Sequence, residues 1–201
     1  MLEARNLACV RGGRSVFAGI EFGLNAGDVL ALRGPNGSGK STLIRLMAGF
    51  LSPVMGDIRW EGNDIGRNLA DHRARLHYVG HADGIKNLLT VRENLAFNVA
   101  LNGGASDALN RALETFDLGS LVDTPGRFLS SGQRRRLSLA RLAAGHRPLW
   151  LLDEPGVGLD AANRNRLETA IDRHREDGGM AIIATHGDVE VKRTLVLEMT
   201  G

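Results

Sequence analysis

The chain contains one run that fits the pattern G-x-x-x-x-G-K-[ST]: Gly34, Pro35, Asn36, Gly37, Ser38, Gly39, Lys40 and Ser41. Glycines allow positive φ angles, so several backbone N–H groups of such a loop can point at one anion. The apolar stretch before the run predicts a strand, and the helical spacing after it predicts a helix whose N-terminus adds partial positive charge. The run therefore predicts a site for nucleotide phosphates. The alternative, a glycine-rich turn that binds nothing, leaves the lysine and the hydroxyl unexplained.

Side chains at and after the end of this run extend the predicted site. Lys40 is long enough to reach the β and γ phosphates, and the Ser41 hydroxyl can ligate Mg²⁺. Thr42, the next residue of the predicted helix, completes the expected nucleotide-binding set. Mg²⁺ is therefore the cofactor expected with a bound nucleoside triphosphate.

A second chemical signal is a pair of carboxylates that follows four apolar residues. The run Leu149-Trp150-Leu151-Leu152 predicts a strand buried on both faces, and Asp153 and Glu154 follow at its tip. We expect Asp153 to hold Mg²⁺ directly or through water. We expect Glu154 to accept a hydrogen bond from the attacking water and orient it toward the γ-phosphate. A solvated turn is the alternative, and the phosphate-binding run upstream disfavours it.

A third signal is the segment Leu129-Ser130-Ser131-Gly132-Gln133, at the start of a predicted helix. Ser130 is a good N-cap, and the first helical turn, which includes the Gly132 N–H, can donate to an anion. Together with the first two signals and in the same order, this segment resembles the Leu-Ser-Gly-Gly-Gln signature of ABC-type ATPases. The resemblance spans nearly the whole chain. It implies an α/β phosphate-loop core with a mixed sheet, an N-terminal antiparallel β region and a helical subdomain.

The resemblance also implies a composite ATP site shared by two copies of the chain. Gly158-Leu159-Asp160 occupies the place of the family's dimer-contacting loop, and His186 matches the histidine that contacts the γ-phosphate, with a catalytic role beside Glu154. A homodimer is therefore expected on ATP binding. Four signature residues would contact the γ-phosphate held by the opposite subunit: Ser130, Ser131, Gly132 and Gln133.

The chain departs from the family pattern at several positions. His81 stands where the family has a glutamine that touches Mg²⁺ and water, and an imidazole could replace it as a metal ligand. No tyrosine or tryptophan precedes the phosphate run to stack on adenine, so Arg11 or Phe17 would have to do so. Ser131 replaces the first signature glycine and is tolerable if its φ is negative. The basic run Arg134–Arg136 is interpreted as a solvated helix face.

The stretch from Tyr78 to Leu95 narrows the resemblance. With Gly80-His81 in place of the usual Pro-Gln, it looks like the ATP-binding subunit of the haem exporter used in cytochrome c maturation. That likeness implies an integral, CcmB-like membrane subunit as partner, and a peripheral place on the cytoplasmic face of the bacterial inner membrane. The sequence has no Cys-x-x-Cys-His and no obvious haem ligand pair, so no direct haem contact is expected. The alternative is a motor for another substrate.

Composition bounds the fold and the function. The 201 residues suit one domain, with a nucleotide-binding core at about 1–81 and 148–201 and a helical subdomain at about 82–147. A net charge of only +2 gives no argument for nucleic acid as partner. A lone cysteine, Cys9, excludes an internal disulfide and is typical of a reducing compartment.

The elements that must position these residues can be placed from periodicity. Short strands are expected at 2–10, 17–24 and 28–33, a hairpin near 56–62, and a further strand at 76–79. Continuous apolar runs at 149–152 and 180–184, separated by a helical pattern at 161–175, indicate a sheet with parallel strands at its centre. The phosphate loop should lie at the carboxyl ends of those strands.

Other phosphate-loop proteins fit less well. A soluble ABC ATPase that acts on DNA or ribosomes normally carries long coiled coils or paired motor domains, for which 201 residues leave no room. A kinase or GTPase has no use for the segment 129–133, and no Asn-Lys-x-Asp guanine reader is present.

Overall fold

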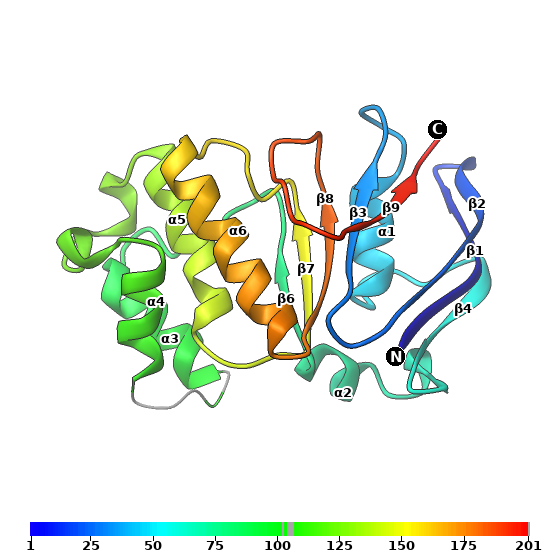
Figure 1. Ribbon diagram of the computed structural model, residues 1–201, viewed down its shortest axis with the longest axis horizontal. Coiled ribbons are helices and arrows are strands. Elements are labelled where there is room, and N and C mark those ends of the chain that lie inside the picture. The colour runs from blue at the N-terminus through cyan, green and yellow to red at the C-terminus, as the bar shows by residue number, and fades with distance from the viewer. Residues whose placement is uncertain (102, 104–106, 201) are drawn as a thin grey trace.

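Five parallel strands form the centre of the molecule, in the order β6-β7-β8-β3-β9 (Figure 1). This computed structural model describes residues 1–101, 103 and 107–200. Every residue of β7 and β8 is buried, as the continuous apolar runs predicted. The edge strand β9 was not predicted from sequence. The strands are β3 (Val29–Arg33), β6 (Leu76–Val79), β7 (Leu149–Asp153), β8 (Met180–Ala184) and β9 (Leu195–Glu198).

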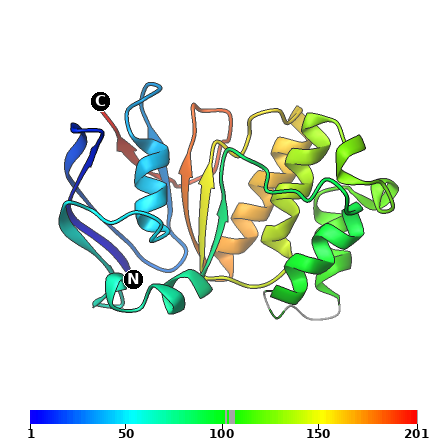
Figure 2. The same ribbon diagram turned by 180° about the vertical axis from the view of Figure 1, so that it is seen from behind.

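Two helices cover opposite faces of this sheet. Alternate strand residues such as Leu30 and Ile182 pack with α1 (Lys40–Met47), whereas Ala181 and Ile183 pack with α6 (Ala161–Glu176). In Figure 1, α6 lies in front of the strands, and Figure 2 shows α1 on the other side. The phosphate loop directly follows the C-terminal end of β3 in this parallel sheet, so it lies at the carboxyl edge, as predicted.

An antiparallel sheet lies at the N-terminal end of the molecule, in the order β2-β1-β4-β5 (Figure 1). Two-residue turns close both of its hairpins, at Gly12–Gly13 and Glu61–Gly62, and all four residues have positive φ. Such turns match the right-handed twist of paired strands, which explains the glycines at these points. The strands are β1 (Leu2–Arg11), β2 (Arg14–Leu24), β4 (Met55–Trp60) and β5 (Asn63–Asp64).

Helices and turns dominate residues 82–147, at the end of the molecule opposite the antiparallel sheet (Figure 1). A reciprocal pair of hydrogen bonds starts the first of these helices: the Glu93 carboxylate accepts from the Thr90 N–H at 2.7 Å, and the Thr90 hydroxyl accepts from the Glu93 N–H at 3.2 Å. The larger helices here are α3 (Val91–Leu101), α4 (Ala108–Thr115) and α5 (Ser131–Ala140).

Short helices complete the fold. They are α2 (Leu69–Ala74) and the 3₁₀ turns η1 (Ile65–Arg67), η2 (Gly119–Leu121), η3 (Gly126–Phe128) and η4 (Arg141–Ala143). Within the part of the chain that the structure describes, no helix has both the length and the apolar character to cross a membrane.

Candidate nucleotide-binding and hydrolysis site

The phosphate loop joins β3 to α1 with backbone that only glycine adopts easily. Gly34, Gly37 and Gly39 have φ of 142°, 84° and 97°. A Cβ at Gly34 would lie 2.2 Å from the Met199 carbonyl oxygen, and one at Gly39 would lie 2.8 Å from a Val16 methyl carbon. At positions 34 and 39 the loop therefore has room for backbone alone, and its glycine conformation allows the close approach that phosphates require.

Lys40 and Ser38 are buried inside this loop. The Lys40 ammonium donates to the carbonyls of Gly34 at 2.7 Å and Pro35 at 3.0 Å, so it spans the loop. The Ser38 hydroxyl is buried without a hydrogen-bond partner among the described residues. The predicted Thr42 lies one turn into α1 and is also buried. The loop thus places a buried cation beside the N-terminus of α1, a combination that fits an anion.

Two of the predicted metal ligands, Ser41 and Asp153, lie together although 112 residues separate them in sequence. The Ser41 hydroxyl donates to Asp153 Oδ1 at 2.8 Å, and Asp153 is 2% exposed. Hydroxyl and carboxylate oxygens are hard donors that suit Mg²⁺. No group of three histidine, cysteine or acidic side chains forms a metal cluster within the described ranges.

Glu154 and His186 meet at the same edge of the sheet. His186 Nε2 lies 3.4 Å from Glu154 Oε1, and both side chains are partly exposed. The backbone holds the two residues close together, because the Glu154 N–H donates at 3.0 Å to the carbonyl of Ala184, two residues before His186. Glu154 itself has a φ of 49°, in the left-handed region that non-glycine residues rarely occupy. The sequence predicted each residue separately, and the fold brings them into contact.

The signature segment begins α5 as predicted. Ser130 caps the helix, its hydroxyl accepting from the Gln133 N–H at 3.3 Å while the Gln133 side chain accepts from the Ser130 N–H at 2.8 Å. Ser131 is the first helical residue and does not have a positive φ, so the backbone condition set for a serine at this position is met. A Cβ on Gly132 would lie 3.1 Å from the Gly158 carbonyl, so the signature contacts the predicted dimer-contacting loop.

Other predicted residues take no part in these contacts. Arg11 is exposed at the end of β1, and His81 is exposed two residues after β6, the strand that pairs with β7. Within the described part of the chain, neither side chain forms a hydrogen bond or an ion pair, so their roles stay predictions. Phe17 is buried beneath Gly39 at 7% exposure and offers no free ring face. The alternative that Phe17 stacks on adenine is therefore wrong.

The interpretation of Arg134–Arg136 as a solvated helix face is also wrong. Arg135 is 5% exposed and donates to four backbone carbonyls, and Arg136 donates to the Asp117 carbonyl. Burial lowers the pKa of Arg135, and the Asp83 carboxylate opposes that shift. Helical spacing could have revealed this, because Arg135 lies one turn before the buried Ser138 and Leu139.

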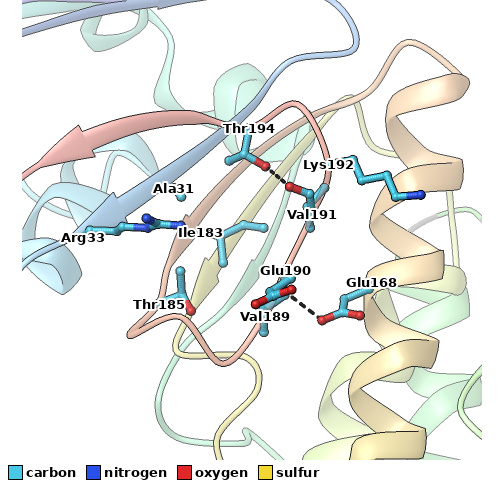
Figure 3. Close-up of a pocket in the computed structure, with 10 residues that line it drawn as sticks. All are labelled: Ala31, Arg33, Glu168, Ile183, Thr185, Val189, Glu190, Val191, Lys192 and Thr194. Carbon is cyan, nitrogen blue, oxygen red and sulfur yellow. Dashed lines mark hydrogen bonds between the residues drawn. The ribbon is translucent and has the colours of Figure 1, made fainter.

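Two cavities lie near the phosphate loop. One, of about 330 Å³, is lined by Arg33, Gly34, Thr185 and His186, among others, and so opens between the loop and the histidine. A neighbouring cavity of about 460 Å³ shares Arg33 and Thr185 and lies between the sheet and α6 (Figure 3). Its walls carry both acidic and basic side chains and none from the phosphate loop, so it is not the nucleotide site.

Comparison with known proteins shows which family has this arrangement of motifs. The ABC transporter family profile matches residues 17–157. The chain belongs to the ABC transporter family. It is thus an ABC-type ATPase, as the order of its three motifs predicted.

Curated relatives narrow the family to the cytochrome c biogenesis ATP-binding export proteins CcmA. The chain is 49% identical over 193 residues to that of Paramagnetospirillum magneticum, covering 94% of this chain and 89% of the relative. It is 45% identical to that of Dechloromonas aromatica, covering 99% and 98%. The likeness expected from the stretch 78–95 is confirmed.

Solved structures share the fold. A putative ABC transporter ATP-binding protein from Pyrococcus furiosus has a TM-score of 0.85 at 23% identity, covering 98% of this chain and 96% of that one. A dimeric ABC cassette bound to ADP and phosphate has a TM-score of 0.82 at 22% identity, covering 92% and 88%. The predicted α/β class with mixed strand directions is confirmed.

Proposed function

We propose that this chain is the ATP-hydrolysing motor subunit of a transporter complex for haem export, or haem-chaperone release, in c-type cytochrome biogenesis. Its CcmA relatives are named as cytochrome c biogenesis export proteins. The observation that carries the motor is the convergence of Lys40, Ser41, Asp153, Glu154 and His186 on one edge of the sheet. Such a set can hold a triphosphate and position a water at its end.

The chemistry divides among these side chains. The loop N–H groups and Lys40 bind the β and γ phosphates and stabilise charge that develops during transfer. Ser41 and Asp153 would hold Mg²⁺, which neutralises phosphate charge when bound. Glu154 accepts a hydrogen bond from the attacking water and holds it in line with the γ-phosphate. His186 touches the Glu154 carboxylate and contacts the γ-phosphate.

The second half of each site comes from another copy of the chain. Ser130 and Ser131 are exposed at the first turn of α5, whose N–H groups point outward at a helix N-terminus. Two chains arranged head to tail would bring this turn onto the partner's γ-phosphate. A solved cassette of the same fold is described as dimeric and bound to ADP and phosphate, which supports this arrangement.

We propose that a membrane partner receives the motion that ATP binding and hydrolysis produce in the helical region. Four large apolar side chains stand exposed in the helical region, and a CcmB-like integral subunit would cover them at the cytoplasmic face of the inner membrane. Residues 82–147 would move as a subdomain against the core, and neither nucleic acid nor haem would contact this chain. The exposed side chains are Leu88, Phe97, Leu101 and Phe128.

Two substitutions test the motor. Glu154→Gln keeps the side-chain shape and removes the charge, so we expect MgATP binding with hydrolysis lost and a stable ATP-bound dimer. Glu176→Gln, on an exposed position at the end of α6, is the control and should hydrolyse normally. Hydrolysis at the normal rate by the Glu154 variant would contradict the role assigned here.

A separate experiment tests the biological assignment. Deletion of the gene should remove covalently attached haem from c-type cytochromes, and the wild-type gene should restore it. Normal holocytochromes would point to another exported substrate and leave the ATPase intact. Co-purification with an integral membrane protein, set against recovery on nucleic acid, separates a transporter motor from a non-transport ABC ATPase.

A further inference from the structure

One buried guanidinium joins three parts of the molecule. Arg135 lies on α5, five residues beyond the signature cap. Its Nη1 donates to the Gly80 carbonyl at 2.9 Å, at the start of the segment that carries His81. Its Nη2 donates to the carbonyls of Asp153 at 3.0 Å and Glu154 at 2.7 Å, and its Nε to that of Pro155 at 3.2 Å.

These contacts use the fork shape of arginine. Five N–H donors in one plane can reach acceptors on three sides, whereas lysine offers three donors from a single point. The charge is balanced nearby, because Asp83 Oδ1 lies 3.6 Å from Nη1. The guanidinium therefore lies inside a ring of backbone carbonyls with one carboxylate at its edge.

The turn that Arg135 grips has an unusual backbone. Glu154 has a φ of 49°, a conformation that is unfavourable for a non-glycine residue and persists only where its surroundings fix it. The Glu154 N–H is held by Ala184 and its carbonyl by Arg135. The backbone conformation at Glu154 sets the direction of its side chain, which reaches His186.

We propose that Arg135 is a positioning residue for ATP hydrolysis: it fixes the Glu154 carboxylate relative to the γ-phosphate and ties that geometry to the position of the signature helix. The proposal rests on the function proposed for Glu154. Arg135 itself touches only backbone carbonyls and Asp83 in the described contacts, so it acts through the turn 153–155 and the Gly80 carbonyl. Movement of α5 would be transmitted to the catalytic carboxylate through this one side chain.

Arg135→Gln and Arg135→Lys test the fork directly. Either variant should bind MgATP with nearly unchanged Kd and lose hydrolysis by about 100-fold, because a displacement near 1 Å of a catalytic group can cost that much. Lysine keeps the charge without the fork, so it should not restore the rate. Arg134→Gln is the matched control, since Arg134 donates to Asn87 and Gly126 and not to the turn 153–155.

A double variant separates positioning from general loss of stability. If Arg135 acts through Glu154, then Arg135→Gln should slow the Glu154→Gln protein little further, since effects of residues that act as a unit are not additive. Additive losses, or a Kd that rises as much as kcat falls, would overturn the proposal. An inactive Glu154→Gln beside a fully active Arg135→Gln would overturn it and leave the proposed function standing. An active Glu154→Gln would instead overturn the role of Glu154 itself.

Discussion

The carboxyl edge of the parallel sheet and the first turn of α5 are the two proposed phosphate contacts, and their side chains are placed very differently. At the sheet edge, Lys40 and Asp153 are buried and hydrogen-bonded to their own loop and helix. At the first turn of α5, Ser130 and Ser131 are exposed and bond only within their own turn. The contrast supports the proposal that binding and turnover can be separated, with one copy holding the nucleotide and a second copy completing the site.

The largest expected effect lies at the sheet edge. Asp153→Asn keeps an oxygen that can accept from Ser41 but removes the negative charge offered to Mg²⁺. Hydrolysis should fall on the order of 1,000-fold, because a bound metal supplies several kcal/mol of charge stabilisation. Steady-state ATPase assays across Mg²⁺ concentrations measure the loss. Asp123→Asn, at an exposed loop position, is the control. If the Asp153 variant kept the Mg²⁺ dependence of the wild type, the role assigned to the sheet edge would be contradicted.

The next effect isolates the signature turn. Aspartate is as good an N-cap as serine, so Ser130→Asp should preserve α5 while placing a negative charge against the partner's γ-phosphate. Dimer formation and turnover should fall about 100-fold, since opposed like charges cost several kcal/mol. Nucleotide binding by the single chain should be unchanged.

Ser130→Asn provides the matched control because it caps the helix without charge. Sedimentation with MgATP, read beside nucleotide affinity, distinguishes the two halves of the site. Equal dimerisation of the aspartate and asparagine variants would show that this turn meets no phosphate.

Acid should lower the stability of the whole fold, and therefore affect both regions together. Burial lowers the pKa of His77 and His174 to about 4 from an ordinary 6.5, and each ring Nε2 lies by a backbone carbonyl. Between pH 6.5 and 4 the unfolded chain binds more protons than the folded one, so stability falls as the pH drops and is unaffected above that window. The loss should approach about 3 kcal/mol for each histidine at the acid end of this window.

Urea unfolding at pH 7.5 and pH 5 measures this slope. His77→Gln with His174→Gln should flatten it, even if the variant is less stable at neutral pH. Trp150 stacks on His174 with ring centroids 4.0 Å apart, so its fluorescence reports the same region. A slope that the double variant retains would assign the acid sensitivity to other groups.

The smallest expected effect is at Ser131. Ser131→Gly restores the usual signature residue at the first helical position, where the backbone does not require positive φ. It should lower the free energy of unfolding by at most about 0.5–1 kcal/mol, through the entropy of glycine in a helix. Turnover should change little. A large gain in turnover would show that the serine side chain hinders the partner's phosphate.

Sequence reasoning went furthest where a motif is continuous. The phosphate loop, Asp153-Glu154 and the capped signature each lie on a few consecutive residues, whose spacing alone fixes their local structure. The buried strands at 149–153 and 180–184 were equally plain, because burial on both faces leaves an unbroken apolar run. The contacts that join these pieces lie 112 residues apart in the case of Ser41 and Asp153, and spacing carries no information about them.

The misses have physical reasons. Three adjacent arginines suggested solvent, but the surrounding turns supply enough carbonyls to bury the middle one. The edge strand β9 has three exposed residues of its four, so it lacks the apolar signal that marked the central strands. Phe17 was considered for a ligand contact because it is aromatic, yet its place beneath Gly39 makes it part of the core.

The crowding at Gly34 changes how loss-of-function variants at that position should be understood. In the segment after β9, the Met199 carbonyl lies against Gly34, and the Met199 N–H donates to the Arg33 carbonyl at 2.8 Å. Any added side chain would therefore push the segment at Met199 away from the phosphate loop before it met a phosphate. A defective Gly34 variant would report broken architecture, and position 37, where a Cβ meets nothing within 4 Å, is the better place to ask what the loop's shape contributes to affinity.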